Sequence, residues 1–405
     1  MPYSRHLTVG VLLAFLLVGG STSILADSVT YQGLPVQATR AEQDAFVEQF
    51  ENLPAPKALA MALTEQGQWA FGWMGDAAGT LPAIGGAISG CERARQQKQI
   101  EVPCELVRVN DEEVEYGRAL RHRLSLDDGN TPALMWRLKK GRSLVYIGGS
   151  LHAFKPSLYP LPPAFEDAYQ RADELILEVD ITNVTPATLQ QLRQKYLLLP
   201  DDQVLDDLLS SALLAQAQAL ATEFGVPWQA LNRLTPGALS AEMAQALFMT
   251  RGLMPNSSFE LYFSQRALAD RKPIGELETL AFQFELVSRI PVELQEDDIS
   301  KTLAESALQL DALIEAWMAG DAERLARLIR NESDSSEALR AFYHELFQQR
   351  NRAMAAKIAE FLDGGKSTRL VLIGAGHLAG EENVISLLAE RGYRAEQLNR
   401  NGRKR

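Results

Sequence analysis

Several features that mark common protein classes are scarce in this 405-residue chain. It has two cysteines and five histidines, and its 52 acidic residues outnumber its 40 lysines and arginines, for a formal net charge of −12. Because such a chain repels nucleic-acid phosphate, nucleic-acid binding is disfavoured. Beyond the N-terminal segment no apolar run approaches the roughly 20 residues that span a bilayer. We therefore expect no transmembrane segment in the mature chain.

Well-known catalytic motifs are also missing. The sequence has no Gly-x-Ser-x-Gly elbow, no P-loop and no Gly-x-Gly-x-x-Gly fingerprint after a strand, so serine hydrolase and nucleotide chemistry are disfavoured. The His-Glu-x-x-His helix of many metalloproteases is absent too. His344 is followed by Glu345, but no second histidine completes that motif.

The first 26 residues have the pattern of a signal peptide. Arg5 supplies the positive start, residues 7–18 are apolar and uncharged, and small residues precede a cleavage point after Ala26. We expect the mature protein to begin near residue 27 and to be periplasmic or secreted.

Cys91 and Cys104 both follow this signal and lie 13 positions apart. An even pair of cysteines in an exported chain predicts a local disulfide. A redox or metal role would call for a Cys-x-x-Cys motif or a nearby histidine, and neither is present.

The most informative feature is a Gly-x-x-His motif that occurs twice, each time after an apolar strand. Gly149–His152 follows residues 144–147, and Gly374–His377 follows residues 370–373. In open α/β sheets, ligands collect beyond the carboxyl ends of the strands, and glycine lets the backbone approach them closely. A single histidine in such a place could simply bond a backbone carbonyl. Two in matching contexts favour a shared site, to which Gly149, Gly374 and Gly376 would contribute backbone for a cofactor.

The fold class predicted from these patterns is α/β. Strand, helix and strand patterns follow each other around each motif, which predicts two βαβ units in one mainly parallel central sheet. Apolar residues at spacings of three and four predict a large helical insertion between the units, at about 185–365. The predicted organisation is a signal peptide (1–26), an N-terminal helical appendage that contains the disulfide (27–130) and an α/β domain (131–400).

The motifs and their surroundings resemble the TraB/GumN family, which includes the Tiki proteins and is related to the erythromycin esterase/ChaN-like fold. The resemblance covers roughly residues 132–400, in order, and its closing motif is the most specific part. Its segments are Gly149–His152, Tyr159–Phe165, Ala172-Asp173, Glu178–Asp180, Phe259–Phe263, Gly275–Thr279, Trp317–Asp321, Arg350-Asn351, Gly374–Gly380 and Gly392-Tyr393.

Three further residues join the two histidines as candidates. Glu178 is a lone carboxylate in an apolar strand, where an unpaired charge would be costly, so we expect a metal, an arginine or a reacting water beside it. The resemblance makes it a metal ligand or general base. It also implies that Arg350 stabilises an oxyanion or pairs with Glu178, and that Asn351 orients a ligand or a bound water.

The leading hypothesis is a metal-dependent hydrolase that acts on a peptide or protein substrate. His152, His377 and Glu178 would hold a divalent transition metal. The resemblance to the family favours manganese or cobalt, with zinc or iron as alternatives. The other hypothesis is a protein that binds a peptide or haem through the same histidines without turnover.

Overall fold

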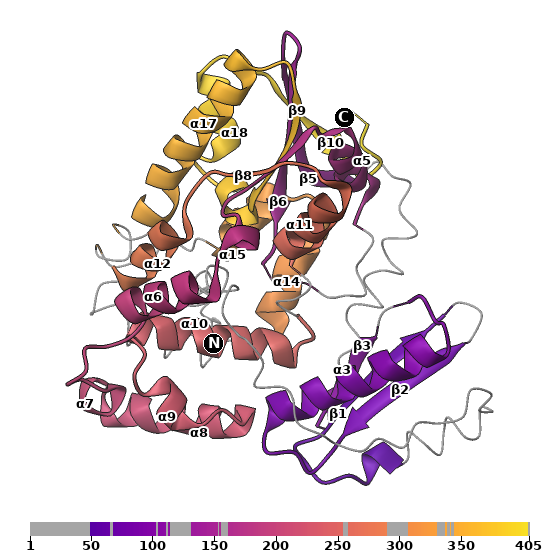
Figure 1. Ribbon diagram of the computed structural model, residues 1–405, viewed down its shortest axis with the longest axis vertical. Helices are drawn as coiled ribbons and strands as arrows, with labels where there is room; N and C mark the ends of the chain where they lie inside the picture. The colour runs from indigo at the N-terminus through magenta and orange to yellow at the C-terminus, as the bar shows by residue number, and fades with distance from the viewer. Residues whose placement is uncertain are drawn as a thin grey trace.

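The computed structural model describes most of the chain after residue 48. The described residues are 49–403 except 65–67, 103, 111, 114–130, 153, 155–160, 254–257, 290–306, 330–336, 338–340 and 342–343. The predicted signal peptide lies outside them. Two sheets divide the described residues, and Figure 1 shows the smaller one, with its helix α3, as a separate lobe. No helix among these residues is both long enough and apolar enough to cross a membrane.

The larger sheet has six strands in the order β10-β5-β6-β9-β7-β8, and every strand except β5 runs in the same direction. This arrangement confirms the predicted α/β class with a mainly parallel sheet. The strands are β5 (Pro132–Lys140), β6 (Ser143–Ser150), β7 (Glu174–Leu177), β8 (Ile274–Glu276), β9 (Thr368–Gly374) and β10 (Ala395–Asn399).

The two predicted βαβ units are present, but neither joins neighbouring strands. Helix α5 (Pro163–Arg171) leads from β6 to β7 across β9, and α18 (Val384–Glu390) leads from β9 to β10 across β6 and β5. Strands β6 and β9 are direct parallel neighbours, with Ser150 opposite Gly374. Both Gly-x-x-His segments therefore leave the sheet side by side.

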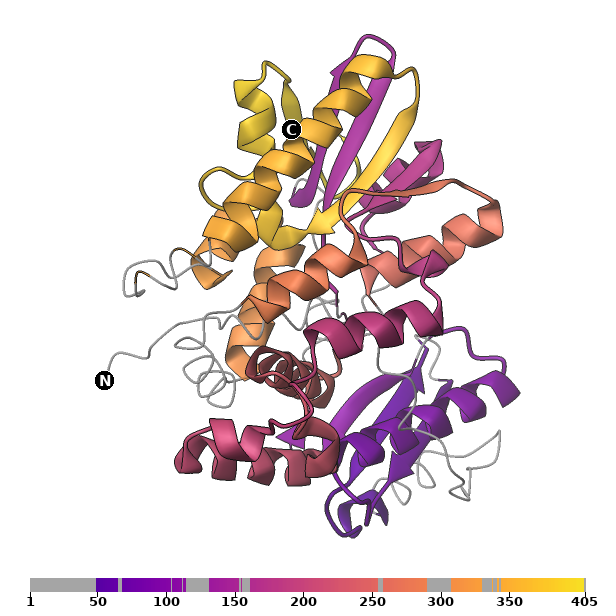
Figure 2. The same ribbon diagram turned by 60° about the vertical axis from the view of Figure 1, so that its left-hand side comes forward.

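The helical insertion lies across the carboxyl edge of this sheet and separates it from the small lobe (Figure 2). Its helices confirm that the described residues of 185–365 are mostly helical, as predicted. They are α6 (Pro186–Tyr196), α7 (Leu205–Leu208), α8 (Ser211–Phe224), α9 (Trp228–Leu231), α10 (Pro236–Thr250), α11 (Phe259–Asp270), α12 (Leu280–Ser288), α14 (Ala307–Met318) and α15 (Ala322–Ile329), followed by the π-helical turn η5 (His344–Gln349) and α17 (Arg350–Gly364).

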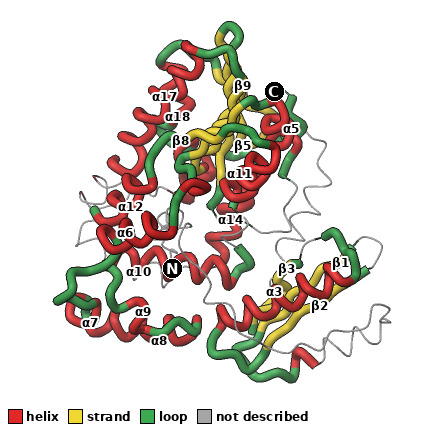
Figure 3. The backbone as a smooth tube through the Cα atoms, viewed as in Figure 1, coloured by secondary structure: helices red, strands yellow, loops and turns green. Residues whose placement is uncertain are grey.

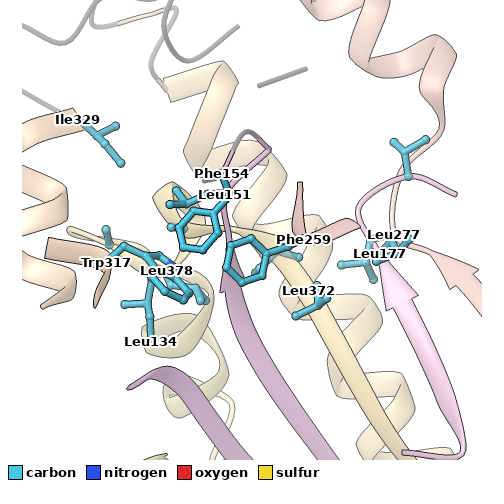
Figure 4. Packing of buried hydrophobic residues seen from close by; sticks show 14 of the residues in the cluster. Leu134, Leu151, Phe154, Leu177, Phe259, Leu277, Trp317, Ile329, Leu372 and Leu378 are labelled. Carbon is cyan, nitrogen blue, oxygen red and sulfur yellow. The ribbon is translucent and has the colours of Figure 1, made fainter. Parts of the chain in front are cut away.

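An aromatic cluster fixes this insertion to the sheet. Trp317 of α14 is buried, and its ring centroid lies 5.0–5.5 Å from those of Phe154, Phe165 and Phe259. Figure 4 shows Trp317, Phe154 and Phe259 together above the ends of the strands. The indole Nε1 donates a 2.7 Å hydrogen bond to the carbonyl of Gly149. The cluster thus holds α11 and α14 against the first motif.

The N-terminal appendage is not helical as predicted, although it contains one helix. Its four-stranded antiparallel sheet has the order β2-β1-β3-β4 and carries α3 on one face (Figure 3). The elements are β1 (Ala58–Leu63), β2 (Trp69–Met74), α3 (Thr80–Gln97), β3 (Glu105–Val109) and β4 (Glu112–Glu113). Residues 57–67 have apolar residues at helical spacing and so predicted a helix, but the pairing of Ala58–Leu63 with β2 and β3 outweighs that local preference.

Small residues explain how this lobe packs. Alanines on β1 and β2 face α3, and a Cβ atom on Gly72 would lie 2.1 Å from the carbonyl oxygen of Ala87. The predicted disulfide is confirmed: Cys91 of α3 is bonded to Cys104 before β3, with 6.0 Å between their Cα atoms. Helix α3 also contacts α8 and α10 of the insertion.

Candidate functional site

A cavity lies where β6 and β9 end. It encloses about 510 Å³, counting the part open to solvent, and both Gly-x-x-His segments border it. Its lining includes polar and charged side chains, and a group of apolar side chains that comes from the helical insertion. The lining residues are Ser150, Leu151, His152, Glu178, Leu313, Ile329, Leu346, Phe347, Arg350, Gly374, Ala375, Gly376 and His377.

Three predicted residues converge on one point of this cavity, beside Gly374. A Cβ atom built on Gly374 would lie 3.1 Å from Glu178 Oε1, 3.5 Å from His152 Nε2 and 3.7 Å from His377 Cδ2. The Nε2 atom of His377 is 3.7 Å from the same Glu178 oxygen. Glycine at position 374 therefore leaves the space that two imidazoles and a carboxylate share.

The ring of His152 is oriented by a buried carboxylate. Its Nδ1 atom lies 3.1 Å from Oε1 of Glu260, at the start of α11, and Glu260 is 8% exposed. Burial alone lowers the pKa of His152, but the negative charge and hydrogen bonding of Glu260 outweigh it, so the pKa is raised. Burial raises the pKa of Glu260, yet the pairing with His152 outweighs burial there too and lowers it. Both shifts favour the charged forms, so the two groups make a buried ion pair when His152 is protonated.

The ring of His377 is held in a corresponding way by an amide. Its Nδ1 atom lies 2.6 Å from Oδ1 of Asn351, which is fully buried on α17. The amide nitrogen of Asn351 donates a 2.9 Å bond to the carbonyl of Glu382, which fixes the amide orientation. Because the amide nitrogen is occupied, the oxygen faces the ring, and His377 carries its proton on Nδ1.

Glu178 lies at the end of β7 and is 3% exposed. Its Oε1 atom accepts a hydrogen bond from the backbone N–H of Gly374, and its Oε2 atom lies 3.0 Å from Arg350. Burial raises the pKa of Glu178, and the nearby charge of Arg350 opposes that rise only in part. The carboxylate is therefore fixed in position and more basic than an exposed one.

Arg350 joins two carboxylates. Its guanidinium contacts Glu278 through Nε and Nη2, each at 2.8 Å, and its Nη1 atom donates to the carbonyl of Leu346. Gln283 also donates to both Glu178 and Glu278. Each nitrogen of Arg350 is thus engaged with the protein. The structure shows the predicted pairing with Glu178, and it gives no support to the alternative of an oxyanion donor.

The donor chemistry of this site suits a transition metal. Two imidazoles whose Nδ1 atoms are held by acceptors, together with a carboxylate, are typical metal-binding groups with their supporting partners. Across the described part of the chain, however, no three or more histidine, cysteine, aspartate or glutamate side chains are gathered tightly enough to hold an ion as they stand. His152, His377 and Glu178 are side chains of the right chemical type for a metal, and they would have to move closer together to hold one.

Comparison with known proteins identifies a matching family. The sequence model of the TraB/PrgY/gumN family matches residues 134–397, which include both histidines and every candidate ligand.

The chain belongs to the TraB/PrgY/gumN family.

This membership confirms the resemblance seen in the sequence. The chain is 25% identical to "Uncharacterized protein YbaP" of Escherichia coli K12 over 261 residues, which is 61% of this chain and 89% of YbaP. It is 26% identical to the protein of the same name from Shigella flexneri, over 60% of this chain and 87% of that protein. No solved structure matches the chain.

Not every predicted site residue of this family member borders the cavity. Gly149 lies outside the lining, and a Cβ atom there would meet Leu134 Cδ2 at 2.3 Å, so core packing explains that glycine. Asn351 lies behind His377 rather than in the cavity. Gly374 and Gly376 both line the cavity, where their contribution to a cofactor site stays a prediction.

Sequence reasoning missed Glu260 and the apolar side of the cavity. Glu260 stood in the family segment at Phe259–Phe263 but looked like an ordinary residue in the first turn of a helix. The apolar residues of α14, α15 and η5 carried only the spacing of buried helix faces. Nothing in the sequence distinguishes core packing from a cavity wall.

Proposed function

We propose that the protein is a metal-dependent hydrolase that cleaves peptides at the cavity between the two Gly-x-x-His segments. One observation carries this proposal. Two histidines from different βαβ units have their Nδ1 atoms held by Glu260 and Asn351, and both rings border the space at Gly374 beside Glu178. Partners of this kind orient the imidazoles in metal sites, and here both rings are turned towards the same carboxylate.

His152, His377 and Glu178 would hold the metal, as a divalent transition metal accepts both imidazole and carboxylate ligands. When bound, it would polarise the substrate carbonyl and make water acidic enough to attack at neutral pH. Manganese and cobalt are the ions that we propose first, on the basis of the family resemblance, with zinc and iron as alternatives.

The residues of the chain supply positioning and proton transfer. If the two histidines alone hold the metal, Glu178 would instead be the general base: burial raises its pKa, which suits a carboxylate that takes a proton from attacking water and returns it to the leaving amine. Arg350 holds one oxygen of Glu178 and keeps its charge compensated when no proton is present. Glu260 and Asn351 prevent rotation of the two imidazoles.

We also propose that the protein acts outside the cytoplasm. The disulfide Cys91–Cys104 supports export, because disulfides persist in oxidising compartments. The predicted signal peptide would direct that export.

The test is a peptide-library digestion by purified residues 27–405, followed by mass spectrometry. The protein would be loaded with manganese or cobalt and compared with His152→Ala, His377→Ala and the exposed control His344→Ala. We expect cleavage by the wild type and by the control, with loss of at least about 100-fold in the two site variants. Cleavage that persists in both site variants or in chelator would contradict the proposal. Saturable binding with every peptide recovered intact would favour the non-catalytic alternative.

A further inference from the structure

The cavity has an apolar side that the proposed chemistry does not use. Leu313 of α14, Ile329 of α15, and Leu346 and Phe347 of η5 all face it, and each is at most 4% exposed in this structure. Leu151 and Ala375, which lie one and two positions before the two histidines in the sequence, are further apolar lining residues. Figure 4 labels two of these residues, Leu151 at the end of its strand and Ile329 beside its helix.

This apolar side begins next to the reacting groups. A Cβ atom on Gly376 would lie 2.8 Å from Phe347 Cε1 and 3.6 Å from Ile329 Cδ1. Gly376 immediately precedes His377, and the rings of Phe347 and His377 are 5.4 Å apart. A substrate group bound here would therefore lie close to a carbonyl held at the histidines.

The charges of the cavity lie on its other side and are already compensated. Arg350 pairs with Glu178 and Glu278, and His152 pairs with Glu260. Among the lining residues the structure describes on the apolar side, none carries a charge. A charged substrate side chain placed there would lose its hydration without gaining a partner, which is strongly unfavourable.

An irregular turn of helix positions two of these apolar residues. Leu346 and Phe347 belong to the π-helical turn η5, which leads directly into α17 with Arg350 and Asn351. Such turns are rare, and they are frequent at functional sites. The same segment thus delivers apolar residues to one side of the cavity and polar residues to the other.

We infer that Leu313, Ile329, Leu346 and Phe347 form a specificity pocket for an aliphatic or aromatic side chain adjoining the substrate carbonyl. This inference rests on the proposed hydrolase function for its biological meaning. The pocket itself can be tested by binding alone.

The experiment uses N-acetyl derivatives of leucine, glycine and aspartate, each as a hydroxamate and as a primary amide. Their affinities for the manganese-loaded protein would be measured by calorimetry. Hydroxamates chelate metals and amides do so poorly. The difference in affinity between the two head groups therefore measures metal binding, and the difference between side chains measures binding in the pocket. We expect the leucine derivative to bind at least about tenfold more tightly than the glycine or aspartate derivative with the same head group, because the leucine side chain is removed from water.

A matched pair of variants locates the effect. Ile329→Phe should fill the pocket and reduce the preference for leucine over glycine to within about threefold, because the remaining volume no longer admits the side chain. Leu268→Phe, the same kind of change at a position that is 59% exposed on α11, should keep the wild-type preference. Thermal unfolding of both variants checks that they remain folded.

The outcomes separate the two proposals. Equal binding of leucine and glycine by the wild type, a preference for aspartate, or no measurable binding of either leucine probe would overturn the pocket. Equal binding of hydroxamate and amide would overturn the metal-dependent function, and the side-chain comparison would still decide the pocket.

Discussion

The Oδ1 atom of Asn351 lies 2.6 Å from the Nδ1 atom of His377, and Asn351 is fully buried. Asn351→Leu removes this acceptor and should weaken metal binding by about 10–100-fold, since the ring of His377 would no longer be held. Asn351→Asp keeps an acceptor oxygen and should retain most of the affinity. Titration with manganese, monitored by calorimetry, measures both. Arg352→Leu, at the next and largely exposed position of α17, is the control and should bind like the wild type.

The ion pair between His152 and Glu260 predicts a pH-dependent stability in the metal-free protein. Burial lowers the pKa of His152, but Glu260 outweighs burial and raises it, so that contribution is present below the ordinary value of 6.5 and lost as pH rises through the raised pKa. The pKa of Glu260 is lowered, so its contribution is present above the ordinary value of 4.5 and lost as pH falls through the lowered pKa.

Glu260→Gln should therefore lower the free energy of unfolding most between these two ordinary values, by about 1–3 kcal/mol. The difference from the wild type should shrink as pH rises through the raised pKa of His152. Denaturant unfolding across this range gives the measurement. A difference that stays constant with pH would mean that the contact is not an ion pair.

Gly374 provides a steric test of the site. Its backbone angles, φ −50° and ψ 135°, are open to any residue, so Gly374→Ala introduces no backbone strain. The new methyl group would contact Glu178 Oε1 at 3.1 Å and should lower metal affinity and turnover at least about tenfold. At Gly364 a Cβ atom would meet nothing within 4 Å. Gly364→Ala is thus the matched control, and we expect full activity with about 0.4–1 kcal/mol more stability.

The disulfide should matter for stability and leave the site unaffected. Removing both cysteines, as Cys91→Ala with Cys104→Ala, frees a loop with a sequence separation of 13 and should cost about 3 kcal/mol of unfolding free energy. Denaturant unfolding measures this loss, while metal titration should give the wild-type affinity. An equal loss of metal affinity would instead show that the small lobe supports the cavity.

Much of the α/β domain could be predicted because its signals are local. The apolar strands before His152 and His377 are buried on both faces, and such strands show as unbroken apolar runs in the sequence. The order of the strands in the sheet could not be predicted from the sequence. Placing β9 between β6 and β7 depends on which buried faces fit together, and those partners are far apart in the chain.

The small lobe shows where local signals mislead. The Ala58–Leu63 segment has a composition that suits a helix, and its conformation is decided by strands that begin 11 and 47 residues after it starts. The same limit applies to the candidate site. Glu178 could be recognised as a lone charge in an apolar strand, whereas Glu260 became visible only when tertiary packing placed it against His152.

Elemental analysis of purified residues 27–405 tests the central claim most directly. The wild type would be incubated in turn with manganese, cobalt, zinc and iron, freed of unbound ion, and compared with His152→Ala, His377→Ala and the exposed control His344→Ala. We predict near-stoichiometric metal in the wild type and in His344→Ala, and loss of that metal in the other two variants. A wild type that retains none of the four ions, or site variants that retain as much as the wild type, would contradict a metal centre at these two histidines.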